Sequence, residues 1–136
     1  MDIETKNWIA GLLVAIVVGH IVTGIFLYTV RGVLGFGSKP KDKTTKRVPP
    51  WLTGCVERLV FAVFVGLDIS GTAPAMIGWL AIKMATNWNR KDMETVTASR
   101  PFSFSALLAG LISMLFAVLG GMICSGKLWS AYVSSI

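Results

Sequence analysis

The apolar stretch 51–88 holds three ionisable side chains that we expect at membrane depth, namely Glu57, Arg58 and Lys83. An isolated charge there costs about 2.5–3.5 kcal/mol on insertion scales, so such residues are candidates for function. Glu57 could bind a proton or a cation, with Lys83 or Arg58 setting its pKa. The other interpretation is a structural ion pair of Glu57 with Lys83 or Arg58, the cations reaching toward the membrane interface. Both roles stay open from sequence alone.

Asp68 is the next charged residue along the same stretch, just before the turn-forming pair Ser70-Gly71. An Asp in this position commonly bonds backbone N–H groups of the turn. Alternatively, Asp68 could lie at the outer mouth of a pathway that also uses Glu57. Gly54, Glu57, Phe61, Phe64 and Asp68 are spaced three and four residues apart, and this spacing places them on one helical face.

His20 lies near the middle of the first apolar stretch. A histidine at this depth could ligate haem or a metal, relay protons, or donate a hydrogen bond to a neighbouring helix. A metal site needs more than one good ligand, and the chain has one His. We therefore expect no metal and no cofactor, with a haem shared by the His20 residues of two copies as the alternative.

Neither the two cysteines nor any motif in the sequence favours catalysis. Cys55 and Cys124 lack metal-ligand spacing, and we expect them at opposite membrane faces, too far apart for a disulfide. The sequence contains no Ser-His-Asp order, no Gly-rich phosphate loop and no carboxylate-histidine cluster. We assign no catalytic residues, and a membrane enzyme is the weakest interpretation.

The hydrophobic composition of the chain predicts the helices that position these residues. The chain is 54% hydrophobic and 15% charged, whereas soluble domains carry about 25% charged residues. Its apolar residues cluster in runs of about 20, the length that crosses a hydrocarbon core. We therefore predict a single all-α polytopic domain, an integral membrane bundle of four transmembrane helices over about 8–30, 51–69, 73–88 and 104–124. The second and third helices should form a tight hairpin, which would bring Glu57 and Lys83 to one depth.

The loop 31–50 gives the strongest orientation signal. It carries six basic residues and a single acid, Asp42. By the positive-inside rule this loop should be cytoplasmic, and four spans then place both termini outside the cytoplasm. Five of its basic residues could also contact anionic lipid headgroups: Lys39, Lys41, Lys43, Lys46 and Arg47. Because most of the formal charge of +6 lies in this loop, membrane lipids explain it better than nucleic acid does.

Small residues recur every four positions in the first and last predicted helices: Gly11, Ala15, Gly19 and Thr23, then Ser113, Ala117, Gly121 and Ser125. Such stripes let helices approach closely, within a chain or between chains. A bundle this small also buries little surface, which favours a homo-oligomer or a larger membrane complex.

Three functions remain open. The first is a non-enzymatic subunit or scaffold of a membrane assembly, in which Glu57, Arg58 and Lys83 serve stability. The second is a small oligomeric transporter or channel that uses Glu57 as its coupling group and has a wet cavity along the Gly54–Asp68 face. The third is a membrane enzyme or a haem-binding protein.

Overall fold

Every regular element of the described residues is a helix. The computed structural model describes residues 2–33, 49–88 and 96–134. The elements in chain order are α1 (Ile3–Leu13), η1 (Val14–Val18), α2 (Gly19–Val33), α3 (Pro50–Gly66), α4 (Thr72–Trp88), α5 (Val96–Cys124) and α6 (Lys127–Ser134). The all-α prediction is therefore confirmed for this part of the chain, while the basic residues of the loop 31–50 from Lys39 to Arg47 lie outside it.

The first three elements form one helical run, Ile3–Val33, interrupted by the π-helical turn η1. A π turn adds one residue to a helical turn, and such turns often mark close contacts or functional sites. Here it contains Ala15, which is fully buried. The sequence predicted a regular helix over about 8–30, and the π turn has no signal in the apolar pattern.

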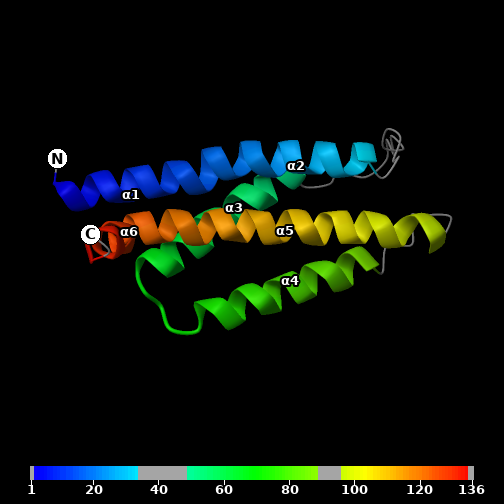
Figure 1. Ribbon diagram of the computed structural model, residues 1–136. Coiled ribbons are helices and arrows are strands. Elements are labelled where there is room, and N and C mark those ends of the chain that lie inside the picture. The colour runs from blue at the N-terminus through cyan, green and yellow to red at the C-terminus, as the bar shows by residue number, and fades with distance from the viewer. Residues whose placement is uncertain (1, 34–48, 89–95, 135–136) are drawn as a thin grey trace.

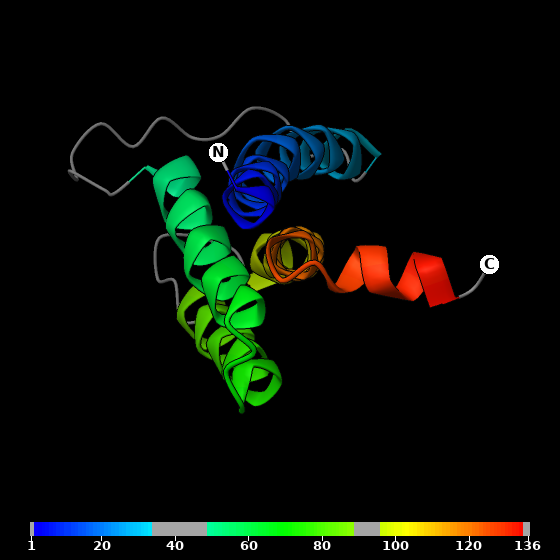
Figure 2. The same cartoon turned by 90° about the vertical axis from the view of Figure 1, so that its left-hand side faces the viewer.

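Helix α5 is the centre of the arrangement. It contacts each of the other described helical elements, and Figure 2 shows α1 and α3 on different sides of it. Glycines make the close approaches possible, since a Cβ on Gly120 would lie 2.7 Å from the Ala15 Cβ. A Cβ on Gly121 would lie 2.7 Å from the Ala62 carbonyl oxygen of α3. The predicted small-residue stripes are thus confirmed as packing surfaces within one chain.

Two helix boundaries differ from those expected. Helix α3 ends at Gly66 rather than near residue 69, because the chain turns away at Asp68, whose φ is +57°. Helix α5 begins at Val96 rather than near residue 104 and includes Pro101. Pro101 has no backbone N–H, so α5 lacks one intrahelical hydrogen bond at this residue.

Helices α3 and α4 each contact α5 more extensively than they contact each other. The tight hairpin expected for them stays a prediction. Trp8 packs against Gly66 and Cys124, so the start of α1, the end of α3 and the end of α5 meet at one end of the bundle. Both termini lie at this end (Figure 1).

Two helices are long and apolar enough to cross a membrane, Ile3–Val33 with 31 residues and Phe104–Cys124 with 21. Helices α3 and α4 have 17 residues each. Large apolar side chains are exposed on several elements. Examples from four different helices are Ile25, Val56, Ile77 and Leu115.

Candidate functional site

The candidate site is a set of charged side chains where α3 meets α4 and α5. Arg58 of α3 is 2% exposed. It reaches α5, where its Nη1 donates a hydrogen bond to the Ser113 Oγ at 3.0 Å. Gly19 of α2 makes room for it, because a Cβ there would lie 2.9 Å from both the Arg58 Cδ and the Phe116 Cβ. The guanidinium therefore sits inside the bundle and joins three helices.

The donors of Arg58 are unevenly satisfied. Its Nη2 lies 3.7 Å from the Sγ of Cys55, a weak acceptor one helical turn away. Its Nε is buried and has no hydrogen-bond partner among the described residues. Among the described residues no carboxylate lies within ion-pair distance of Arg58. Since a guanidinium stays protonated in proteins, the bundle holds a buried positive charge with a hydroxyl as its main partner.

Glu57 faces a different neighbour. Its Oε2 accepts a hydrogen bond from the Lys83 Nζ of α4 at 2.5 Å. The Glu57 side chain is 9% exposed and that of Lys83 is 35% exposed, so the pair lies at the edge of the interior. Consecutive helical residues point about 100° apart. That geometry explains why Glu57 pairs with α4 while Arg58 packs on α5, and why the Glu57–Arg58 pair considered from sequence does not form.

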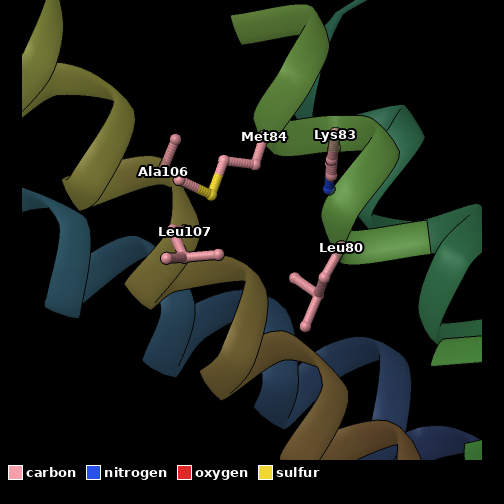
Figure 3. Close-up of a pocket in the computed structure, with 5 residues that line it drawn as sticks. All are labelled: Leu80, Lys83, Met84, Ala106 and Leu107. Atoms are coloured by element: carbon pink, nitrogen blue, oxygen red, sulfur yellow. The ribbon is translucent and has the colours of Figure 1, made fainter. Parts of the chain in front are cut away.

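The second carboxylate oxygen of Glu57 does not take part in the bond to Lys83. The Oε1 is buried, and no residue in the described part of the chain hydrogen-bonds to it. Lys83 also borders a cleft between α4 and α5, together with Leu80, Met84, Ala106 and Leu107 (Figure 3). The cleft has about 10 Å³ of free space, which is the room of a single water molecule. The arrangement can hold charge and a water within the bundle, and it offers no room there for an organic substrate.

Phe61 and Phe64, the two aromatic residues of the Gly54–Asp68 face, pack against apolar side chains and do not line a water-filled cavity. Phe61 is 8% exposed and forms a cluster with Met76 and Ala117. The Phe61 and Phe64 rings meet edge to face, with their centroids 6.3 Å apart. The face that carries Glu57 and Asp68 at its ends is thus interrupted by an apolar contact with α5.

Asp68 lies in different surroundings from Glu57 and Arg58. Its Oδ1 accepts a hydrogen bond from the Lys127 Nζ at 2.6 Å, and the two side chains are 78% and 48% exposed. The structure therefore places Asp68 in a surface ion pair that ties the segment after α3 to the start of α6. Lys127 was not singled out from sequence, because nothing in the pattern relates residues so far apart along the chain.

His20 lies on the exposed outer face of α2. It forms no hydrogen bond or ion pair with any described residue. In the described ranges no group of three or more His, Cys, Asp or Glu side chains could hold a metal ion. The functional partner that sequence reasoning missed is Ser113, whose place in a small-residue stripe concealed its role as a hydrogen-bond acceptor.

Comparison with known proteins assigns the chain to no group. No protein-family model, no curated protein and no solved structure matches it.

Proposed function

We propose that the chain is an integral membrane protein with four spans. At 1.5 Å per residue, the 17-residue helices α3 and α4 are each about 25 Å long. That length is at the lower end of the range for spanning helices. The exposed large apolar residues suit lipid contact, while Glu57 and Arg58 are buried inside. With the loop 31–50 in the cytoplasm, both termini lie outside it.

Within the membrane, we propose that the protein is a non-enzymatic subunit or scaffold that oligomerises. One observation carries this proposal: the buried charges are engaged in joining helices. Arg58 joins α3 to α5 through Ser113, and Lys83 joins α4 to α3 through Glu57. Charges used in this way fix the mutual positions of the helices and leave the outer surface free for a partner.

The outer face of α2 is the best candidate for that partner. The internal stripe Gly11–Gly19 is already covered by α5, whereas a Cβ on Gly24 would meet nothing within 4 Å. His20 lies four residues before Gly24, on the same helical face. A neutral imidazole has one donor and one acceptor nitrogen, so two His20 side chains can pair across a two-fold axis. We assign the homo-oligomer contact to His20 and Gly24.

The oligomeric state of the purified protein tests this assignment. We expect the wild type to form a dimer or higher oligomer in detergent by light scattering after size exclusion. Gly24→Ile should give monomers, because it blocks close approach, and His20→Leu should weaken the oligomer. Gly78→Ile is the matched control, since Gly78 of α4 also has open space. A monomeric wild type, or a Gly24→Ile variant that stays oligomeric, would overturn the proposed contact.

Transport is the second candidate, favoured by the unpartnered Oε1 of Glu57 close to the Lys83 cleft. A coupling carboxylate needs an oxygen that is free to take a proton or a cation. Proton or cation flux into proteoliposomes that is abolished by Glu57→Gln in a folded protein would support transport. Absence of flux in the wild type would leave the scaffold as the proposed function.

A further inference from the structure

A second hollow lies at the end of the bundle that holds both termini. It is a groove of about 640 Å³ between the start of α1 and helix α6, closed on its third side by the end of α5. Its lining residues are Lys6, Asn7, Ala10, Ile123, Leu128 and Trp129. Pockets that bind small molecules measure about 300–1,000 Å³. Unlike the cleft beside Lys83, this groove has room for part of an organic ligand.

The walls of the groove are fixed by several contacts. Helix α6 leaves the end of α5 at Gly126, whose φ of +71° is readily adopted by glycine (Figure 2). A Cβ on Gly126 would lie 3.8 Å from the Asn7 Nδ2, so α1 packs close to this turn. The Lys127–Asp68 ion pair holds the start of α6. The Cys124 Sγ also lies 3.7 Å from the Trp8 carbonyl oxygen, which ties α5 to α1.

The residues that line the groove are of two kinds, aliphatic ones (Ala10, Ile123 and Leu128, named the floor) and polar ones (Lys6 and Asn7, named the rim). The aliphatic residues suit an alkyl chain. Lys6 supplies an ammonium with three donors, and Asn7 supplies an amide with two. Trp129 is 64% exposed, and exposed tryptophans are enriched at the level of lipid headgroups.

The charges near the rim decide what kind of headgroup fits. Lys6 makes no ion pair with a described carboxylate. The exposed Asp2 precedes Lys6 by one helical turn, and Lys127 is held by Asp68. The exposed Glu4 lies in the same turn, so three carboxylates and two ammonium groups lie at this end of the bundle, and net charge does not favour an anion. Recognition must come from direct hydrogen bonds of Lys6 and Asn7 to an acceptor, as a phosphate provides, rather than from net charge alone.

We infer that this groove binds one phospholipid molecule. Its phosphate oxygens accept hydrogen bonds from Lys6 and Asn7, and one acyl chain lies along Ala10, Ile123 and Leu128. The inference rests on the proposed membrane location. It places a specific lipid at the end of the bundle that holds both termini. The sequence instead predicted headgroup contacts at the basic loop 31–50.

Native mass spectrometry of the detergent-solubilised protein with added dioleoyl phosphatidylglycerol tests the site. We expect one lipid to be retained per chain, and dioleoylglycerol, which lacks the phosphate, to be lost. Lys6→Gln should weaken retention about tenfold, which is the effect of losing about 1.4 kcal/mol of charge-assisted hydrogen bonding. Leu128→Trp should fill the floor and weaken retention as well. Lys6→Arg, which keeps the positive charge and the hydrogen-bond donors, is the control and should retain the lipid.

The possible outcomes separate this inference from the proposed function. Equal retention of dioleoylglycerol, or unchanged retention by both Lys6→Gln and Leu128→Trp, would overturn the phospholipid site. So would loss of the oligomer in Leu128→Trp, because a second copy would then occupy the groove. A chain that resists carbonate extraction from membranes but retains no lipid overturns this inference alone. A chain that carbonate extracts overturns the membrane location itself.

Discussion

The two ion pairs that join described residues have similar geometry in different surroundings. Lys83 and Glu57 are 2.5 Å apart, and Lys127 and Asp68 are 2.6 Å apart. The carboxylate is 9% exposed in the first pair and 78% exposed in the second. Water can replace either partner of an exposed pair, whereas a buried carboxylate that loses its partner stays unsolvated. The distance between two charges is therefore a poor guide to how much the pair stabilises the bundle.

The same lysine substitution in each pair should show this difference most strongly. We expect Lys83→Met to lower the free energy of unfolding by about 3 kcal/mol, because both oxygens of Glu57 are then unpaired. The effect belongs at the lower end of values for buried pairs, since Lys83 is 35% exposed and water reaches it. Lys127→Met should cost less than about 1 kcal/mol. Unfolding by SDS in mixed micelles measures both.

A double variant identifies the cause of the Lys83→Met effect. Adding Glu57→Gln removes the unpaired charge, so Glu57→Gln/Lys83→Met should be more stable than Lys83→Met alone. If the double variant is the less stable one, Glu57 stabilises the bundle through contacts other than Lys83, and the ion-pair explanation is wrong.

The sequence was informative about the interior for a physical reason. Apolar runs and four-residue stripes are local patterns, and they predicted the helices and the buried face of Gly11, Ala15 and Gly19. Glu57 and Lys83 stood out because charges are rare in apolar runs. The sequence left Lys83 and Arg58 open as partners of Glu57, and the structure pairs Glu57 with Lys83.

What the sequence did not predict depends on contacts between distant segments. Ser113 lies 55 residues from Arg58, and Lys127 lies 59 residues from Asp68. No local pattern encodes either pairing. The π turn at Val14–Val18 likewise has no apolar signal of its own. Which of two adjacent charges faces α4 and which faces α5 depends on helix rotation, and rotation is set by packing.

A second comparison uses two serine hydroxyls of one stripe that have different hydrogen-bond partners. Ser113→Ala should lower the free energy of unfolding by about 2 kcal/mol, because the buried Arg58 Nη1 loses an acceptor. Ser125→Ala is the matched control on the same stripe. Its hydroxyl bonds only the Met122 carbonyl one turn back, so its loss should be nearly neutral. Equal stability of the two variants in the SDS titration would mean that water replaces the Ser113 hydroxyl at Arg58.

The smallest expected loss of stability is at a covered glycine, which we compare with an open one. A Cβ on Gly121 would lie 2.5 Å from the Val65 Cβ, so Gly121→Ala forces α3 and α5 apart. We expect a loss of about 1–2 kcal/mol, since overpacking outweighs the better helix propensity of alanine. Gly78→Ala meets no atom within 4 Å and should gain up to about 1 kcal/mol from propensity alone. The opposite signs of the two changes in the free energy of unfolding matter more than their sizes. If the same SDS titration shows both variants to be stabilised, the α3–α5 contact yields to an extra methyl group, and close packing at Gly121 does not hold the bundle together.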